Sequence, residues 1–444
     1  MSALPTENLL NNLWVLICGV LVFLMTISVG ILERGELGKG ANSALMKNIM
    51  ISCSGFFFMA FLGFSVAFAP TIGGGLMGNP LYNFPFMGGF QSNSADIFTQ
   101  VWWSMGPKYF DNLVTLPSYF FFETAFATVT LALVGVIVLR KMKLEAFFLY
   151  SIPYFILIWA LPAAWIWNPQ GWLFIMGVRD FAGGLVVHGA AGAAGLAIVL
   201  RVWQEEKKKG LEESPQVQPK PNTPWLSLSI LLLWLGWFGF NPGSTLALNI
   251  QSYIVVLITF LAASTGFLFT MFFRYLETRK MPNIMYAANG ILIGLIVITP
   301  VAGYVSPGSA VILGILGSIV FILGEKLFQR AKWFTDPIGL FPGHFLGGIF
   351  GFIMVAFFTQ YSYASFGGGS GLPNGLLFGG GMQALHQLGL QLLAIPVVLG
   401  TVFVLSYVFM WIISKGIHGI IREYTDVELG EQKIKSSESL HQGF

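Results

Sequence analysis

The 444-residue sequence contains few charged residues and almost no cysteine. Charged side chains make up 10% of the chain, whereas a soluble domain has about 25%, so the composition argues against a water-soluble globular protein. The two cysteines, Cys18 and Cys53, lie in apolar segments, and we interpret them as small core residues without a disulfide framework or metal site. The net charge of +3 indicates neither an acidic partner nor a nucleic-acid ligand.

Motifs for catalysis and cofactor binding are also missing. No nucleophile–base pair or carboxylate dyad occurs at catalytic spacing, and the Gly-Gly-Gly runs at 73–75, 367–369 and 379–381 are not followed by Lys-Ser or Lys-Thr, as a phosphate-binding loop requires. The N-terminus carries no Lys or Arg before its first apolar run, so we expect a retained span there rather than a signal peptide. We expect neither an enzyme nor a bound cofactor.

Long apolar runs fill most of the chain. It is 55% hydrophobic, with a mean hydropathy of +0.74. A helix needs about 20 apolar residues to cross a bilayer, which predicts an all-α polytopic membrane protein with eleven transmembrane helices. The expected spans are 12–32, 49–70, 117–139, 145–166, 181–203, 224–241, 250–273, 283–300, 308–325, 338–358 and 386–414.

The distribution of basic residues predicts the orientation of these spans. All of the 23 Lys and Arg residues except Lys108 and Arg179 fall in alternate connections or in the C-terminal tail. The first such connection carries Arg34, Lys39 and Lys47. Because basic residues accumulate on the cytoplasmic side, we expect the N-terminus outside and the C-terminus in the cytoplasm of a cell membrane, plasma or inner.

Two segments of the chain share one pattern. DFAGGLVVHGAAGAAG begins at Asp180 and DPIGLFPGHFLGGIFG begins at Asp336; in each, a histidine follows the aspartate by eight residues. Glycines then occur four and seven residues after each histidine, at Gly192, Gly195, Gly348 and Gly351. Small residues at this spacing are typical of closely packed membrane helices.

The repeated pattern predicts the domain organisation. Spans one to five and six to ten are odd-numbered sets, so the two halves enter the membrane in opposite senses and form an inverted five-plus-five repeat with its site near the midplane. We expect one transmembrane domain over 1–414, with repeat A at about 12–203, repeat B at about 224–358 and an extra helix at about 386–414. A cytoplasmic tail follows over 415–444.

His188 and His344 occupy equivalent places in the two halves, inside apolar segments. Neutral imidazoles can pass protons or hydrogen-bond a small polar solute without the cost of a buried charge. We therefore interpret the two histidines as sharing one pathway. Zinc binding is the rival interpretation, but it needs three or four ligands, and no further His, Cys or acid keeps useful spacing.

Asp180 and Asp336 precede their histidines by eight residues, about 12 Å of helix, and so cannot touch them. Either carboxylate can cap a helix N-terminus by accepting from backbone N–H groups, and this is our main interpretation of both. Asp180 could also help an incoming cation at the outer mouth.

Aromatic residues gather near the predicted outer ends of several spans. Phe122 and Phe126 lie one helical turn apart in FFETAFATVT, and LGWFGFNPGS at 235–244 contains Phe240 and Ser244. Trp167 lies just outside span four. These aromatics could form plain core, an interfacial belt or a cage for a small cation such as ammonium. Glu123, between the two phenylalanines, lies either near the outer interface or along the pathway.

These motifs resemble the ammonium transporter (Amt, methylammonium permease and Rhesus) family. The resemblance rests on DFAGGLVVH, GWFGFNPGS, the FE-x-x-FA-x-x-T stretch and NGILIGLIVITPVAGYVSP, and it covers nearly the whole chain. It implies eleven spans with an inverted repeat and a homotrimer in which each subunit holds its own hydrophobic pore.

The resemblance assigns roles to individual residues. His188 and His344 resemble the twin histidines of the pore; Phe126 and Phe240 resemble the phenylalanine gate. Trp167, Phe122 and Ser244 resemble the outer ammonium-recruitment site, and Asp180 resembles the structural or recruiting aspartate. The implied function is transport of ammonium, ammonia or methylammonium through the lipid bilayer. An ammonium sensor with little flux and a pore for another small neutral solute are the alternatives.

The sequence departs from the family pattern at several positions. Glu123 stands where the family has Gln, Leu185 where Thr is usual, and Thr335 and Gly339 replace two acids before the second histidine. The tail, REYTDVELGEQKIKSS, lacks the family's GLD-x-x-x-HGE-like end. This departure puts in question regulation by a PII-type signal protein and communication between subunits through the tail.

Overall fold

The computed structural model of this chain is predominantly helical. It describes residues 6–37, 42–138, 141–211, 222–331, 336, 339–366 and 371–421. The α-helices are α1 (Thr6–Leu37), α2 (Asn42–Phe58), α3 (Phe64–Phe68), α4 (Ser94–Thr99), α5 (Leu116–Val138), α6 (Leu144–Pro153), α7 (Ala160–Ile166), α8 (Trp172–Met176), α9 (Ala190–Lys208), α10 (Thr223–Gly243), α11 (Ile250–Thr278), α12 (Ile284–Ile298), α13 (Pro307–Phe328), α14 (Leu346–Phe358), α15 (Tyr361–Ala364) and α16 (Gly381–Gly416).

Shorter elements interrupt or connect these helices. Within the described residues, four π-helical turns, in which the backbone bonds to the fifth residue instead of the fourth, are η2 (Met59–Gly63), η4 (Tyr154–Ile158), η5 (Gly184–Gly189) and η6 (Leu340–Phe345). The same ranges contain the 3₁₀ turns η3 (Phe86–Gly88) and η7 (Leu376–Phe378) and an antiparallel pair of two-residue strands, β1 (Thr71–Ile72) and β2 (Met77–Gly78), which lie in connections. π-turns occur frequently at functional sites.

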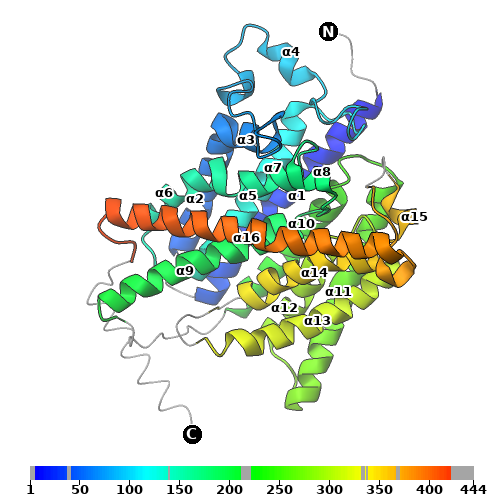
Figure 1. Ribbon diagram of the computed structural model, residues 1–444. Helices are drawn as coiled ribbons and strands as arrows, with labels where there is room; N and C mark the ends of the chain where they lie inside the picture. Colours follow the sequence, from blue (N-terminus) through cyan, green and yellow to red (C-terminus); the bar gives the residue numbers. More distant parts are fainter. Residues whose placement is uncertain are drawn as a thin grey trace.

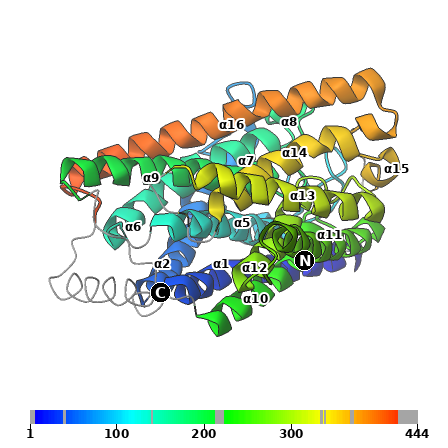
Figure 2. The ribbon, with the colours of Figure 1, turned by 90° about the horizontal axis from the view of Figure 1, so that it is seen from below.

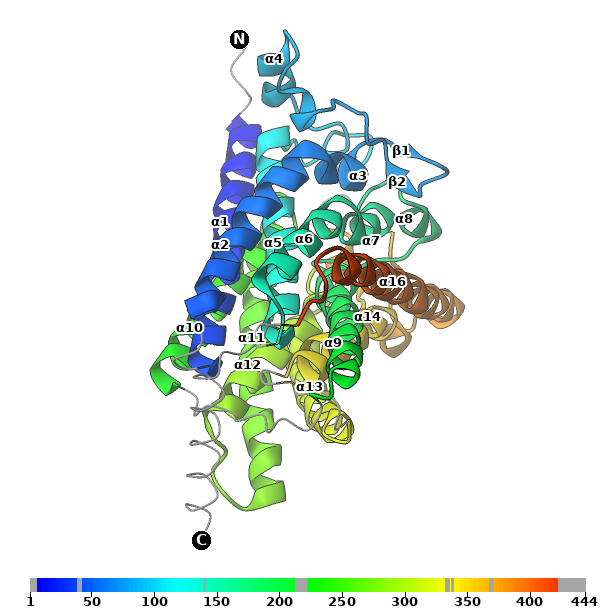
Figure 3. The ribbon, with the colours of Figure 1, turned by 90° about the vertical axis from the view of Figure 1, so that its left-hand side faces the viewer.

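The long helices pack into one bundle around two clusters of buried apolar residues. Figure 3 shows α1, α2 and α5 side by side, with α3, α4, α8 and both strands gathered at one end of the bundle. In Figure 1, α16 runs across the bundle at a steep angle to α1. Figure 2 shows the same helix along one edge, beside α9 and α14. α16 therefore braces the helices that follow η5 and η6.

Ten helical segments in the described part of the chain are long and apolar enough to cross a membrane. Each overlaps one of the spans predicted from the sequence. The remaining prediction, 283–300, corresponds to α12, whose 15 residues reach about 22 Å at 1.5 Å per residue. This length is less than the roughly 30 Å of a hydrocarbon core, because the helix ends at Ile298, just before Thr299 and Pro300.

Two sequence interpretations need correction. Lys47 lies inside α2 instead of in a cytoplasmic connection; it is 1% exposed and forms an ion pair with Glu33 of α1. A buried lysine is tolerated in an apolar bundle when a carboxylate pairs with it, and α2 begins at Asn42, before the predicted start of the span at 49. Cys18 is buried as expected, but Cys53 is exposed on the outer surface of the bundle.

Some predictions concern segments outside the described residues. Thr335 and the tail from residue 422 onward belong to them. The first part of the predicted tail is described, because Ile420 and Ile421 donate backbone N–H groups to Glu205 of α9.

Candidate transport pathway

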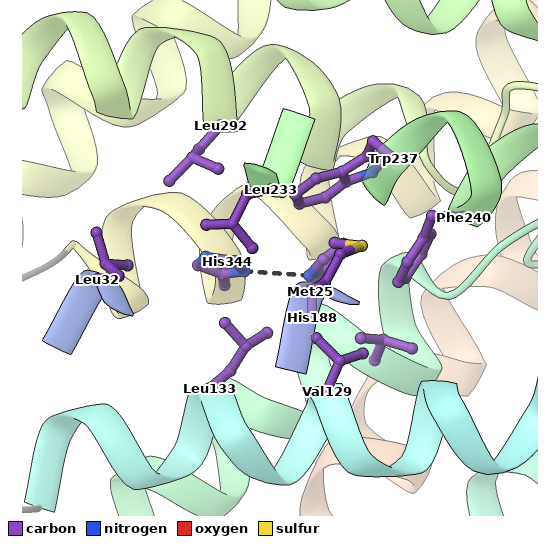
Figure 4. Close-up of a pocket in the computed structure, with 11 residues that line it drawn as sticks. Met25, Leu32, Val129, Leu133, His188, Leu233, Trp237, Phe240, Leu292 and His344 are labelled. Atoms are coloured by element: carbon purple, nitrogen blue, oxygen red, sulfur yellow. Dashed lines mark hydrogen bonds between the residues drawn. The ribbon is translucent and has the colours of Figure 1, made fainter. Parts of the chain in front are cut away.

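His188 and His344 meet in the centre of the bundle. They lie in η5 and η6, are 1% and 4% exposed, and bring their Nδ1 atoms to 3.1 Å (Figure 4). A contact between two Nδ1 atoms requires that one donates a proton and the other accepts, so the two imidazoles hold different tautomers. The pair can therefore offer a solute both a hydrogen-bond donor and an acceptor while both imidazoles stay neutral.

An otherwise apolar wall surrounds the histidine pair. A small cavity there is lined by Met25 and Leu32 of α1, Val129 and Leu133 of α5, Val187 and His188 of η5, Leu233, Trp237 and Phe240 of α10, Leu292 of α12 and His344 of η6. In Figure 4, leucine side chains lie around His344, whereas Trp237 and Phe240 lie on the side of His188. Such a wall disfavours an ion and suits a small neutral molecule.

Aromatic rings continue the pathway from His188. The ring of Phe240 stacks on His188 at a centroid distance of 5.8 Å and an angle of 17°. Phe126 of α5 lies 4.3 Å from Phe240, and Phe122, one turn away, lies 4.8 Å from Phe126. All three phenylalanines are almost fully buried, so the structure brings together the residues whose resemblance implied a gate.

Trp167 closes this column at the end where α8 lies. Its ring meets Phe126 edge to face at 5.8 Å and 89°, and its Nε1 donates to the backbone oxygen of Asp180 at 2.8 Å. Trp167 is half-buried, so part of this residue remains accessible. Ser244, one turn beyond Phe240, donates its hydroxyl to the Phe240 carbonyl and keeps its oxygen lone pairs available to accept.

Asp180 holds the histidine turn η5 through its carboxylate. Oδ1 accepts from the N–H groups of Gly183 and Gly184, and Oδ2 accepts from those of Leu185 and Val186, at 2.7–3.0 Å. This is helix capping at the start of a turn, where backbone N–H groups lack partners. Leu185, a departure from the family pattern, therefore contributes its backbone to this cap.

Asp336 has the same relation to η6. Its Oδ1 accepts from Leu340 N–H at 2.9 Å and its Oδ2 from Phe341 N–H at 2.8 Å. Gly339 has a φ of 74° and Gly183, at the equivalent place, a φ of 112°. Glycine adopts such positive φ values without steric cost. The backbone thus accounts for Gly339 at this position, whatever side chain related sequences carry.

Glycines allow the two half-sites to cross at close range. A Cβ atom on Gly348 of α14 would collide with the Gly184 carbonyl oxygen and lie 2.9 Å from the Cβ of His188. A Cβ on Gly192 of α9 would collide with the ring of Phe345, the residue after His344. Each helix thus packs its glycine against the histidine turn of the other half.

Glu123 lies on α5 beside the aromatic column. It is 6% exposed, and its Oε2 has no hydrogen-bond partner among the residues that the structure describes. Phe122 and Phe126 lie one turn apart on one face of α5, and a neighbouring position is turned by about 100° along a helix of 3.6 residues per turn. The Glu123 side chain therefore leaves α5 in a different direction from the two rings.

Sequence reasoning named Trp237 only as one of the aromatics at the end of span six, and it did not predict the stacking of Trp237 on His188 or its bond to Thr299. Trp237 stacks on His188 at 5.6 Å and 20°, and its Nε1 donates to Thr299 Oγ1 at 3.1 Å. The signal available in the sequence was the position of Trp237, three residues before Phe240 and on the same helix face. Thr299 gave no signal, because it is distant in sequence.

A model of the ammonium transporter family matches residues 13–438 of this chain. The chain belongs to this family. The family match covers nearly all of the predicted transmembrane domain, and it confirms the resemblance inferred from the motifs. The chain is a multi-pass membrane protein with two hydrogen-bonded histidines buried in its centre.

Individual members of the ammonium transporter family resemble this chain along most of its length. It is 31% identical over 382 residues to the ammonium transporter of Aquifex aeolicus, covering 85% of this chain and 82% of the relative. It is similar to the solved structure of Saccharomyces cerevisiae Mep2, with 26% identity, a TM-score of 0.78 and coverage of 94% and 88% of the two chains. A sensor Amt protein is similar at 25% identity and a TM-score of 0.78, covering 96% and 97%. These matches do not favour sensing over transport.

Proposed function

We propose that this chain transports ammonium as ammonia through a hydrophobic pore in each subunit. The observation that carries the proposal is the continuous column of Phe126, Phe240, His188 and His344. The ring centroids of Phe126 and Phe240 lie 4.3 Å apart and those of Phe240 and His188 5.8 Å apart, and the Nδ1 atoms of the two histidines lie 3.1 Å apart. The column has an apolar wall that disfavours a charged solute. Methylammonium is a second substrate of the same class.

Recruitment takes place at the Trp167 end of the column. Aromatic faces attract cations by about 0.5–2 kcal/mol, so Trp167 and Phe122 hold ammonium while the Ser244 oxygen accepts a hydrogen bond from it. The cation then loses a proton near Asp180 or Glu123. Ammonia passes Phe126 and Phe240 and runs along the two imidazoles, which exchange hydrogen bonds with it.

The finer architecture belongs to this proposal. We infer eleven spans in an inverted five-plus-five repeat, with α12 as the eighth span, the N-terminus outside and the C-terminus in the cytoplasm. The repeated order of aspartate, positive-φ glycine, π-turn and histidine supports the repeat. Repeat A covers about 12–203, repeat B about 224–358, and α16 stands outside them.

We further propose a homotrimer in the bilayer of a plasma or inner membrane, with no enzymatic activity. Regulation by a PII-type protein has no support from the tail sequence. The electrogenic and electroneutral forms of transport differ in the fate of the proton, which either crosses through the two imidazoles or stays outside. Currents on a supported membrane under an ammonium gradient separate the two: a current accompanies the first and is absent in the second.

Uptake of labelled methylammonium by transport-deficient cells tests the pathway. We expect His188→Ala and Phe240→Ala to change uptake strongly relative to wild type at equal protein in the membrane, because each removes one step of the column. Equal uptake by all three proteins would refute the assigned pathway. Ligand binding by the wild type without any uptake would instead favour the sensor.

A further inference from the structure

Gln391 of α16 is fully buried, and its amide group makes four hydrogen bonds. Oε1 accepts from the Arg179 N–H at 3.2 Å and from Gln387 Nε2 at 3.1 Å. Nε2 donates to the carbonyl oxygens of Arg179 at 2.8 Å and Phe352 at 2.9 Å. An amide has two N–H donors and two acceptor lone pairs, so every hydrogen-bonding position of this side chain is used.

Gln391 thus bonds to both backbone groups of Arg179, its N–H and its carbonyl. Gln387, one turn before Gln391, adds a bond from its Nε2 to the Gly177 oxygen at 3.0 Å. On the other side, Phe181 N–H donates to the Pro300 oxygen at 3.1 Å. The segment that leads to Asp180 is thus held by α16 on one side and by the residue that follows α12 and Thr299 on the other.

The segment that Gln391 and Gln387 hold is hydrogen-bonded to Trp167, the tryptophan assigned to recruitment. Asp180 follows Arg179, and its carbonyl oxygen accepts the bond from Trp167 Nε1. The Asp180 carboxylate is already held by four N–H groups of η5, whereas the carbonyl holds Trp167 by a single bond. A displacement of the Arg179–Asp180 peptide would therefore move Trp167 before it moves η5.

The fourth bond of Gln391 connects this segment to the second half-site. Phe352 belongs to α14, which continues from the turn that carries His344. Gln391 therefore joins the peptide before one histidine turn to the helix after the other, from a helix outside the repeat. An apolar side chain of equal size would fill the same space but would leave the N–H and the carbonyl of Arg179 without these partners.

We propose that Gln391 is a positioning residue for cation recruitment. It fixes the Arg179–Asp180 peptide so that the Asp180 carbonyl holds the Trp167 indole against Phe126. The inference rests on the proposed recruitment role of Trp167. Because the histidine pair is built from other contacts, loss of Gln391 weakens substrate capture more than it slows passage through the column.

The test is methylammonium uptake kinetics in transport-deficient cells, with protein in the membrane measured for each variant. Gln391→Met, which nearly conserves volume, should raise KM about tenfold, equal to about 1.4 kcal/mol of binding free energy, with kcat changed less than twofold. Gln387→Met removes the Gly177 bond and one bond to Gln391, so it should raise KM by a smaller factor. Gln383→Met is the matched control, because Gln383 is exposed on the same helix.

A double-mutant cycle separates failure of this inference from failure of the proposed function. If Gln391 acts through Trp167, Gln391→Met should add little to the KM increase of Trp167→Leu. A normal KM in Gln391→Met and Gln387→Met, with a raised KM in Trp167→Leu, would overturn the positioning role alone. A normal KM in Trp167→Leu would overturn the recruitment site and the inference with it. A fall in kcat with unchanged KM would assign Gln391 a structural role only.

Discussion

Asp180 accepts four backbone N–H groups of its histidine turn and is 4% exposed, whereas Asp336, within the described part of the chain, accepts from Leu340 and Phe341 and is half-buried. These two bonds to η6 have counterparts at the same sequence distance from Asp180. The two half-sites therefore share one design, and they differ at the sixth residue after the aspartate, where the first half has Val186 and the second has Pro342.

Pro342 provides a physical reason for part of this difference. It lies six residues after Asp336, the place that Val186 has relative to Asp180. Val186 donates its N–H to the carboxylate, but proline has no N–H to donate. The second turn instead gains the fixed φ of proline, which restricts the unfolded chain. At this position the first turn thus has a hydrogen bond to its aspartate, and the second has the conformational restriction of proline.

Removing the two aspartates should produce the largest contrast. Asp180→Ala removes partners from four N–H groups and should cost on the order of 4 kcal/mol, at about 1 kcal/mol for each bond. Asp336→Ala removes partners from two N–H groups of η6, which amounts to about 2 kcal/mol on the same scale. Thermal unfolding midpoints of the purified proteins in detergent measure the order. A larger decrease for Asp336→Ala would contradict the unequal design, and the exposed Asp96→Ala on α4 serves as the control.

Substitution of the crossing glycines should give the next largest effect. Gly348→Ala meets the backbone of Gly184, which cannot rotate away, whereas Gly192→Ala meets the side chain of Phe345. Overpacking typically costs 1–3 kcal/mol, so we expect Gly348→Ala to lower methylammonium uptake about tenfold and Gly192→Ala to lower it less. Gly195→Ala, 3.1 Å from the Leu340 side chain, should remain close to wild type. Equal uptake by Gly348→Ala and Gly195→Ala would show that the crossing does not set the pathway.

The positive-φ glycines give a smaller contrast. Gly339→Asp places a Cβ 3.2 Å from the Phe321 ring, whereas Gly183→Asp places it 2.5 Å from Val187 Cγ2. Aspartate tolerates the left-handed region better than most residues, so Gly339→Asp should cost about 1 kcal/mol and Gly183→Asp more. Unfolding midpoints measure the difference. A stable Gly183→Asp beside an unstable Gly339→Asp would reverse our reading of the two turns.

Pro342→Val should have the smallest effect and makes the two turns more alike. It supplies an N–H at the position from which Val186 reaches Asp180, and a hydrogen bond to a carboxylate is favourable. Loss of the proline offsets part of this gain, so the net change should stay within about 1 kcal/mol. The melting midpoint of Pro342→Val, compared with that of Pro342→Val combined with Asp336→Ala, isolates the new bond. If Pro342→Val changes the midpoint equally with and without Asp336→Ala, the new bond to Asp336 does not form.

Sequence patterns predicted the helical bundle better than they predicted its contacts. Ten of the predicted spans correspond to long apolar helices, because hydropathy is a property of each segment alone. The start of α2 was placed too late, because Lys47 reads as a loop charge until its partner Glu33 is known. An ion pair between two helices depends on their relative placement, which the composition of each segment does not predict.

The candidate site shows the same limit. The histidines could be identified from their repeated spacing, but the order of Phe126, Phe240 and Trp167 came from the family resemblance. The stacking of Trp237 on His188 and the role of Gln391 were not predicted, because a stacking partner and a buried amide depend on which helices become neighbours. Gly339 looked like a missing acid in the sequence, and only its φ of 74° shows what the position requires.

The crossing of Gly192 and Gly348 has a consequence for rate and selectivity. Gly348 packs α14 against the backbone of η5, and Gly192 packs α9 against the Phe345 side chain of η6, so we expect the spacing of the imidazoles to stay the same whichever solute enters. A segment of constant width cannot distinguish solutes by closing around them. We therefore expect discrimination between ammonium and other cations to be completed before the solute reaches His188, and saturation of flux to follow events at the two mouths.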